Sequence, residues 1–392
     1  MEKQENKKIE QLLSRGVEEV IEKDALEKKL KIGKKIRVKF GIDPTSPNIH
    51  LGRAIPLLKL RDFQELGHKI ILIIGDFTGV IGDTSDKESE RPMLTEKQVK
   101  ENMKTYIQQA EKILDIKKCE ICYNSKWLGK LNYREIANQA NIFSLNEFCS
   151  RENIKKRLDA GKRVSLRELL YPLAQGYDSV VARADIEIGG TDQRFNLLTG
   201  REMQRYYKQK PQDIMTNPLI EGLDNRKMSS SWGNTINLFD SANEMFGKIM
   251  SLKDELIIKY FILTTRIDLA QIEKYKKEIK AGANPKDYKM KLGFEIARFY
   301  HSEKDAEKAQ NYFIEVFAKK QVPDKMLEIK PSAYDILTIL KESGVCLTKS
   351  DARRVVEQKG VRINKIVVDD FKTIAKKRDI IQKGKRFFIK VK

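Results

Sequence analysis

A strand, a polar turn and a helix within residues 36–52 constrain the fold of this chain most. Ile36, Val38 and Phe40 alternate with charged residues, which predicts a half-buried strand. Glycine and proline after this strand predict a loop, and a helix is expected to begin at His50. The free N–H groups and the dipole of a helix N-terminus favour a bound phosphate. We therefore expect an anion site at this strand-to-helix turn.

The polar loops that follow are expected to meet at one edge of a sheet. Residues 69–74 form a continuous apolar run, typical of a strand covered on both faces, and lead into a loop at 75–91. A short strand at 186–188 leads into Gly-Gly-Thr-Asp-Gln, and a further loop occupies 222–233. Alternating strands and helices favour a mainly parallel sheet, in which ligands bind beyond the carboxyl ends of the strands. The expected fold class is therefore α/β, with a Rossmann-like parallel sheet.

Other stretches predict the remaining organisation. Residues 7–30 have the apolar spacing of one amphipathic helix. Residues 115–165 interrupt the strand–helix rhythm and read as a mostly helical insertion. Helical patterns continue from 241 to about 319, and residues 320–331, with two prolines, predict a linker. Residues 333–392 predict a small α+β domain of two helices and short strands.

The charge of the chain points to a polyanionic partner. The formal net charge is +20, and residues 333–392 hold 16 Lys and Arg against 7 Asp and Glu, a net charge of +9. A clustered basic surface favours nucleic-acid binding over a merely solvated surface.

Cysteine usage and hydropathy favour a cytoplasmic protein. Four cysteines form no disulfide pattern, and Cys119 and Cys122 have no second pair at zinc-binding spacing, so reduced thiols and no metal site are expected. No apolar run approaches the ~20 residues of a membrane span, and the first eight residues lack a signal-peptide core.

Four motifs in order resemble the bacterial-type tyrosine–tRNA ligases, which are class I aminoacyl-tRNA synthetases. They are Asp-Pro-Thr…His-Leu-Gly at 43–52, Ile-Gly-Asp…Lys…Arg at 81–91, the helix and Gly-Gly-Thr-Asp-Gln stretch within 171–193, and Lys-Met-Ser-Ser-Ser at 227–231. The segment at 344–364 resembles a small RNA-binding domain shared with a ribosomal protein. The resemblance covers almost the whole chain.

The resemblance implies activation of L-tyrosine by ATP with Mg²⁺, followed by transfer to a tyrosine tRNA. Attack on the α-phosphate needs little acid–base chemistry, so catalysis depends on positioning and on stabilising phosphate charge. The implied catalytic residues are His50, Lys227, Lys87, Arg91 and Thr45. The implied ATP-binding residues are Asp43, His50, Gly52, Arg53, Asp192, Lys227, Met228, Ser229 and Ser230.

The resemblance also implies an anchor for each end of tyrosine. Tyr171, Gln175 and Asp178 are spaced to share one helix face. Asp178 suits the phenol, whereas Tyr171, Gln175 and Asp83 suit the ammonium group and Gln193 the carboxylate. The implied tyrosine-binding residues are Tyr171, Gln175, Asp178, Asp83, Gln193 and Gly41, and the implied tRNA-binding residues are Lys349, Arg353, Arg354 and Arg362.

Five positions depart from the family pattern, two of them being Thr84 and Asp86, which replace a proline and a glycine often seen beside Asp83. Arg53 replaces a second histidine but keeps a cation near the phosphates, and Ser230 replaces a second lysine, as in some archaeal-branch relatives. Lys39 stands where many members have a tyrosine that also bonds the substrate phenol, so that second bond has no assigned residue.

The resemblance implies a catalytic domain at 1–235, a helical anticodon-recognition domain at 236–320, a linker at 321–332 and a basic RNA-binding domain at 333–392. It also implies a homodimer formed through the insertion at 115–165. Two alternatives stay open. A non-catalytic RNA-binding protein on a synthetase scaffold would explain Arg53 and Ser230. It would not explain the residues implied to bind tyrosine along one helix face. The sister enzyme for tryptophan would have little use for a carboxylate at Asp178.

Overall fold

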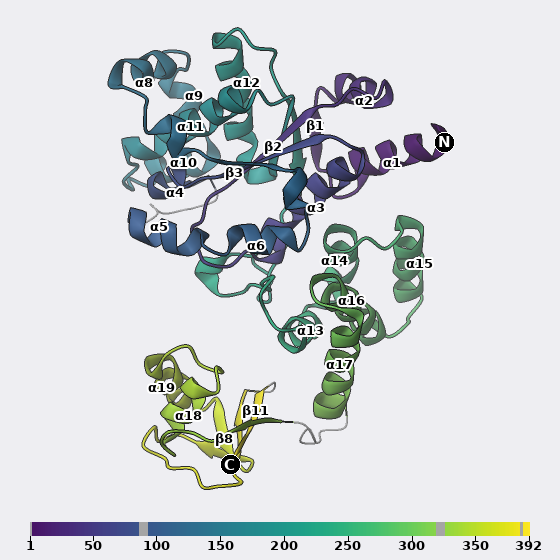
Figure 1. The fold of residues 1–392 in the computed structure, drawn as a ribbon, viewed down its shortest axis with the longest axis vertical. Helices are drawn as coiled ribbons and strands as arrows, with labels where there is room; N and C mark the ends of the chain where they lie inside the picture. The colour runs from purple at the N-terminus through teal and green to yellow at the C-terminus, as the bar shows by residue number, and fades with distance from the viewer. Residues whose placement is uncertain (1, 86–92, 319–325, 385–386) are drawn as a thin grey trace. The chain divides into compact units, whose positions relative to one another are not determined.

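The computed structural model describes residues 2–85, 93–318, 326–384 and 387–392 (Figure 1). The chain forms two compact units, which are described separately. The first contains Met1–Asp240 and Ser251–Leu292, and the second contains Ser241–Met250 and Gly293–Lys392. In the described part, no helix is long and apolar enough to cross a membrane.

The first unit is built on a six-stranded sheet with the order β1-β6-β5-β2-β3-β4. Its strands are β1 Glu19–Ile21, β2 Arg37–Ile42, β3 Lys69–Ile74, β4 Glu120–Tyr123, β5 Ile186–Gly190 and β6 Asp213–Asn217. All neighbouring strands run parallel except β1, which pairs antiparallel with β6. Ile70–Ile74 of β3 are buried, which confirms the strand expected from that apolar run. The predicted α/β class with a mainly parallel sheet is thereby confirmed.

The first unit also contains helices. They are α1 Glu2–Ser14, α2 Lys23–Lys31, α3 Leu51–Glu65, α4 Thr78–Ile81, α5 Glu96–Met103, α6 Tyr106–Glu111, α7 Ser125–Leu128, α8 Tyr133–Ala140, α9 Leu145–Cys149, α10 Glu152–Asp159, α11 Leu166–Ala182, α12 Arg194–Tyr206, α14 Ile257–Thr264 and α15 Leu269–Lys280, while α16 Pro285–Tyr300 runs on into the second unit. Capping boxes fix the starts of α5, α8, α9 and α11. Helices α11 and α12 pack side by side (Figure 1).

The prediction of one helix over residues 7–30 is wrong. Gly16, at φ +60°, follows the end of α1 in a left-handed conformation that suits glycine. The chain then forms β1, whose backbone pairs with β6, before α2 begins. Ile9, Leu12 and Leu13 are buried as the amphipathic pattern indicated, but strand pairing overrides the helical pattern beyond them.

The predicted insertion at 115–165 begins with a strand. Glu120–Tyr123 forms β4 and pairs in parallel with β3, so the sheet extends one strand further than expected. These four residues are only partly buried because β4 is the edge strand, and they lack the apolar run that marks β3. The rest of the segment is helical, from α7 to α10, as predicted.

The second unit contains a helical part and a small α+β part. The helical part includes α13 Ala242–Met250, the end of α16, α17 Glu303–Phe313 and a π-helical turn Ile314–Ala318. A five-stranded sheet with the order β7-β11-β10-β8-β9 follows, together with α18 Ile336–Glu342 and α19 Lys349–Glu357. Its strands are β7 Leu327–Ile329, β8 Val361–Ile363, β9 Ile366–Val368, β10 Ile380–Lys383 and β11 Phe387–Val391.

Strand β7 lies in the stretch that the sequence assigned to a linker. It pairs in parallel with β11, so the small sheet begins before residue 333. The core of this part is apolar and includes Ile336, Leu340, Val356, Ile381 and Ile389. The described residues between α13 and α17 form no strand, in line with the predicted helical stretch.

Candidate functional site

A pocket of about 630 Å³ lies at the carboxyl ends of β2, β3 and β5 in the first unit. The sheet edge therefore collects the polar loops, as the parallel topology predicts. The following predicted site residues line the pocket: Gly41, Asp43, Thr45, His50, Gly52, Arg53, Asp83, Tyr171, Gln175, Asp178, Asp192, Gln193, Lys227, Met228, Ser229 and Ser230. Lys87 and Arg91, which were also predicted, lie outside the described residues.

Asp43, directly after β2, is the centre of a buried hydrogen-bond cluster. The Thr78 hydroxyl donates to its Oδ1 over 2.7 Å, and the Tyr171 hydroxyl donates to its Oδ2 over 2.9 Å. Burial raises the pKa of Asp43 to about 6, although these two bonds lower it. A Cβ at residue 75 would lie 1.9 Å from Asp43 Oδ1, so Gly75 is required for this approach.

His50 is the N-cap residue of α3 and is 6% exposed. Burial, and then the charges of Arg53 and Lys227, lower the pKa of His50 to about 3, so its imidazole is neutral. Its Nδ1 is buried without a hydrogen-bond partner among the described residues. A neutral imidazole at the start of a fifteen-residue helix suits an anion because it adds a donor to the helix N–H groups.

Arg53 holds the turn that follows β2. Its guanidinium donates to the Asp43 carbonyl over 3.0 Å, to the Thr45 hydroxyl over 2.6 Å and to the Tyr106 hydroxyl over 2.9 Å. The expected cation therefore lies in the pocket wall, where two of its contacts fix the loop between β2 and α3 and the third joins it to α6.

The Asp178 carboxylate closes one end of the pocket. Trp127 Nε1 donates to Oδ1 over 2.8 Å, and Asn124 Nδ2 donates to Oδ2 over 3.1 Å. Burial raises the pKa of Asp178 to about 7, with the charge of Glu187 adding to the rise, whereas Lys39 and the two donors lower it. Tyr171 and Gln175 lie along the same face of α11, so the predicted wall of three side chains is present.

A second polar cluster borders the pocket beside α12. Gln193 Nε2 donates to Asp83 Oδ2 over 2.6 Å, and Asn196 Nδ2 donates to Gln193 Oε1 over 3.0 Å. Asp83 also accepts from the backbone and the hydroxyl of Ser85. Two of the predicted tyrosine-binding residues, Asp83 and Gln193, are therefore joined directly.

The loop at 227–231 reaches back over the strand-to-helix turn. Lys227 Nζ pairs with Asp192 Oδ2 over 2.8 Å, both side chains being partly exposed. Gly52 N donates to the Met228 sulfur over 3.4 Å, and the hydroxyls of Ser46 and Ser230 lie 3.1 Å apart. Ser230 thus connects two loops at a position where the family usually has a lysine.

Lys39 does not line the pocket. It is fully buried and pairs with Glu187 of the neighbouring strand over 2.8 Å. Sequence reasoning missed this pair, and it also missed Thr78, Asn124 and Trp127. If β4 had been recognised as a strand, the polar Asn-Ser pair directly after it would have indicated Asn124 as a site residue.

The predicted tRNA-binding residues all lie in the second unit, on α19 and β8, and are exposed. Arg354 pairs with Asp351 over 2.8 Å. Arg353 pairs with Glu357 and stacks 4.1 Å from the Phe371 ring centroid. These contacts leave the cationic groups at the surface, where phosphates can reach them.

Comparisons with known proteins agree with this geometry. Residues 30–318 match the family described as tRNA synthetases class I (W and Y), and residues 336–381 match the S4 domain. The tyrosine–tRNA ligase of Thermotoga maritima is 45% identical over 385 residues, which cover 97% of this chain and 96% of that protein. The tyrosine–tRNA ligase of Mannheimia succiniciproducens is 45% identical over 382 residues and covers 97% of each chain.

Solved structures share the fold. A C-terminally truncated mitochondrial tyrosyl-tRNA synthetase of Aspergillus nidulans superposes with a TM-score of 0.66 at 20% identity, covering 79% of this chain and 94% of that one. The tyrosyl-tRNA synthetase of Archaeoglobus fulgidus, complexed with L-tyrosine, gives a TM-score of 0.62 at 24% identity, covering 78% and 99%.

Proposed function

This chain belongs to the class I tRNA synthetases for tryptophan and tyrosine, and from that premise we propose how its pocket serves a tyrosine–tRNA ligase. The enzyme joins L-tyrosine to ATP, releases pyrophosphate, and passes the tyrosyl group to the 3′-terminal adenosine of its tRNA. The observation that carries the proposal is one pocket with an anion-binding helix start at one side and a buried carboxylate at the other.

Tyrosine is held through its two polar ends. The phenol donates to Asp178, which Trp127 and Asn124 hold in place. The ammonium group lies against Tyr171, Gln175 and Asp83, and Gln193 receives the carboxylate, with Gly41 giving room beside the substrate. The tyrosine–tRNA ligases that match 97% of this chain support tyrosine over tryptophan as the substrate.

ATP is held at the turn after β2. His50 donates to the phosphates at the start of α3, Gly52 allows close approach of the nucleotide, and Asp192 receives the ribose hydroxyls. Lys227 then exchanges its bond to Asp192 for one to the phosphates, which costs little because both side chains are partly exposed. The ATP side of the pocket also includes Met228, Ser229 and Ser230. The loop after β2 is fixed by Asp43, Thr45 and Arg53.

The chemical step is a substitution at phosphorus. An oxygen of the tyrosine carboxylate attacks the α-phosphorus, and the bond from that phosphorus to the pyrophosphate oxygen breaks. No proton has to move, so the side chains act by alignment and by stabilising charge that passes to the leaving group. His50 and Lys227 are the described donors for that charge, and Lys87 and Arg91 are proposed to add to it.

Mg²⁺ enters with ATP. The described residues contain no group of three or more His, Cys, Asp or Glu that could hold a metal ion. Mg²⁺ commonly keeps its waters and binds through substrate phosphates, so a site without a protein cage fits it. Bound there, it would neutralise phosphate charge.

Binding of tRNA is assigned to residues 236–392 in this proposal. The basic domain at 333–392 grips RNA phosphates through Lys349, Arg353, Arg354 and Arg362, and the helical domain at 236–320 recognises the anticodon. The exposed arginines of α19 and the match to the S4 domain support this assignment.

We also propose a cytoplasmic homodimer. Large apolar side chains are exposed in and beside the insertion at 115–165, including Tyr133 at 89%, Leu145 at 65% and Leu166 at 77%. The exposure of several large apolar side chains within and beside one segment supports an interface there. A second copy of the chain is the proposed partner.

The test is charging of tRNA. Total bacterial tRNA, ATP, Mg²⁺ and labelled tyrosine should give tyrosyl-tRNA with the purified chain, and chelation of Mg²⁺ should stop the reaction. Charging with tryptophan instead, or binding of tRNA without charging by any amino acid, would contradict the proposal. The second result would favour the non-catalytic RNA-binding alternative.

A further inference from the structure

We propose that the buried ion pair of Lys39 and Glu187 is a positioning pair for the amino-acid pocket, which turns the carbonyl oxygen of the Gln175 amide toward the ammonium group of the substrate. The inference rests on the proposed function, because it specifies how that pocket receives tyrosine. Neither Lys39 nor Glu187 is among the residues that line the pocket.

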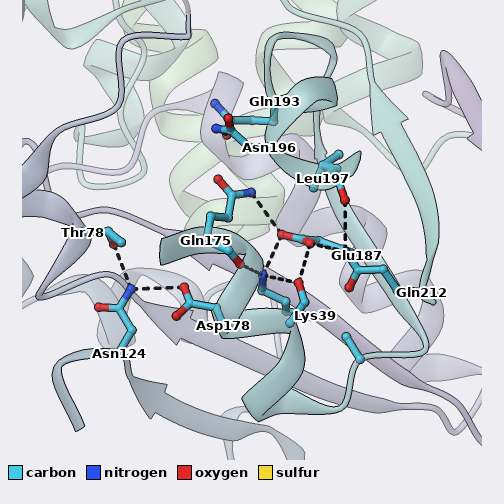
Figure 2. Close-up of polar contacts among 12 residues, drawn as sticks. Lys39, Thr78, Asn124, Gln175, Asp178, Glu187, Gln193, Asn196, Leu197 and Gln212 are labelled. Carbon is cyan, nitrogen blue, oxygen red and sulfur yellow. Dashed lines mark hydrogen bonds and ion pairs between the residues drawn. The ribbon is translucent and has the colours of Figure 1, made fainter. Parts of the chain in front are cut away.

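The two charges face each other across neighbouring parallel strands. Lys39 of β2 is the register partner of Glu187 of β5. Lys39 Nζ lies 2.8 Å from Glu187 Oε1, and the two side chains are 0% and 1% exposed (Figure 2). Two charges removed from water are tolerated only when their geometry is good and their remaining hydrogen-bonding groups are satisfied.

That condition is met on both sides of the pair. Lys39 Nζ also donates to the Gln175 backbone oxygen over 3.0 Å and to the Ser179 hydroxyl over 2.9 Å, which uses its three N–H groups. Glu187 accepts from Lys39, from Gln175 Nε2 over 3.1 Å, from the Ser179 hydroxyl over 2.9 Å and from Gln212 Nε2 over 2.5 Å. Both charged groups are therefore satisfied, which rigidifies the residues that contact them. Within the network, Gln212 Oε1 is buried without a hydrogen-bond partner among the described residues.

Helix α12 leaves space for the network. A Cβ at Gly200 would lie 2.6 Å from Gln212 Nε2 and 2.9 Å from the Ser179 hydroxyl. The glycine therefore lets Gln212 reach Glu187 between the two packed helices.

The network fixes which end of the Gln175 amide enters the pocket. An ionised carboxylate only accepts hydrogen bonds, so the end of Gln175 that contacts Glu187 has to be the NH₂ group. Figure 2 shows the Gln175 side-chain oxygen pointing away from Glu187. An ammonium group only donates, so it needs that oxygen, whereas a reversed amide would set one donor against another.

Lys39 supports this arrangement and also acts on the far end of the substrate. Without its cation, Glu187 would be an uncompensated buried charge. The charge of Lys39 also lowers the pKa of Asp178, against the rise that burial causes. One buried lysine thereby serves both the amide proposed for the ammonium and the carboxylate proposed for the phenol.

The double variant Lys39→Met with Glu187→Gln tests the proposal, because it removes both charges and leaves no cation to hold the oxygen of the new amide. The new NH₂ group can then donate to the Gln175 oxygen, so the Gln175 amide should reverse and present its NH₂ group to the pocket. Dissociation constants would be measured for tyrosine and for 3-(4-hydroxyphenyl)propionate, which lacks the ammonium group. Tyrosine should bind about 10- to 100-fold more weakly, the range for one hydrogen bond to a charged group, while the propionate should change less than about threefold.

Asp213→Asn is the matched control. Asp213 is also buried and pairs with Lys29 over 2.5 Å, on the neighbouring strand β6, and neither residue lines the pocket. The Asp213→Asn variant should change the dissociation constants of both ligands less than about threefold. Equal weakening of both ligands by the double variant, or unchanged tyrosine binding by it, would overturn the positioning role.

The single variant Glu187→Gln gives a second readout and covers the case in which the double variant does not fold. Lys39 Nζ only donates, so it should hold the oxygen of the new amide at the Oε1 position, which also accepts from Gln175 Nε2. Tyrosine binding by the single variant should therefore change less than about threefold, and a selective loss of tyrosine binding there would overturn the role given to Lys39. Failure of the unmodified chain to bind tyrosine would instead overturn the proposed function itself. The two failures are therefore distinguishable by one binding experiment on the unmodified protein.

Discussion

Replacing Asp178 by asparagine should remove most of the preference for tyrosine over phenylalanine. The carboxylate is 3% exposed, and Trp127 and Asn124 hold it at 2.8 and 3.1 Å. Its remaining acceptor capacity faces the pocket, where the substrate phenol is proposed to donate. Asparagine keeps the shape of the side chain but loses the charge and one acceptor oxygen.

The size of the effect follows from that lost acceptor. A hydrogen bond to a charged group contributes about 1.5–3 kcal/mol, and each 1.4 kcal/mol is a factor of ten. The kcat/KM for tyrosine in pyrophosphate exchange should therefore fall about 10- to 100-fold. Phenylalanine has no hydroxyl to lose, so its kcat/KM should change less than about threefold.

The assay compares both substrates in the unmodified chain, in Asp178→Asn and in Asp213→Asn. Asp213 is also buried and pairs with Lys29, and neither of these two residues lines the pocket, so its variant reports general damage to the sheet. Thermal unfolding should be recorded for each variant. Equal losses for tyrosine and phenylalanine in Asp178→Asn would refute the phenol contact and leave Asp178 a structural role.

Three further predictions concern the phosphates, pH and tRNA. Lys227→Ala should lower the maximal rate of pyrophosphate exchange about 100-fold and leave the dissociation constant of tyrosine unchanged, because the cation acts on charge that develops during the reaction; equal effects on both would contradict it. Because burial raises the pKa of Asp178 to about 7, the ionised acceptor becomes more populated as pH rises, so the tyrosine/phenylalanine ratio of kcat/KM should increase from pH 6 to pH 8. Lys39→Met removes a charge that lowers this pKa and should move the increase to higher pH, whereas an unchanged pH profile would refute the coupling. Arg354→Ala with Arg362→Ala should reduce the slope of log tRNA affinity against log salt by about 0.7–0.9 per lost phosphate contact, with pyrophosphate exchange unchanged; an unchanged slope would place the RNA surface elsewhere.

The sequence predicted the pocket because the order of motifs and the sheet topology agree. Asp43 and Tyr171 are 128 positions apart, yet their side chains meet at 2.9 Å. Parallel strands place their carboxyl ends at one edge, so polar loops after separate strands converge whatever their separation in the chain. The position of each described pocket residue at that edge is established, while its chemical role stays a prediction.

What the sequence missed depends on pairing between strands. Asn124 was not assigned to the pocket because β4 is a short, partly buried edge strand with no apolar run. Lys39 was recognised as a departure, but its partner Glu187 lies 148 positions away in the sequence. The two residues meet only because β2 and β5 are neighbours in the sheet. Local periodicity carries no information on which strands are neighbours.

The prediction for residues 7–30 fails for a related reason. An apolar pattern continuing past Gly16 suits a helix, but the backbone of β1 forms hydrogen bonds to β6, nearly 200 residues later in the chain. Strand β7 was not predicted for the same reason, since its partner β11 lies at the C-terminal end of the chain. Long-range strand pairing determines the secondary structure of both segments, and local propensity does not.

The most direct test of the account is amino-acid-dependent exchange of pyrophosphate into ATP, measured without tRNA for each of the twenty amino acids. The pocket contains the proposed anchors for tyrosine and ATP within the first unit alone. The account predicts exchange with tyrosine and Mg²⁺ and little with tryptophan or phenylalanine. Exchange with another amino acid, or none from well-folded protein, would contradict it.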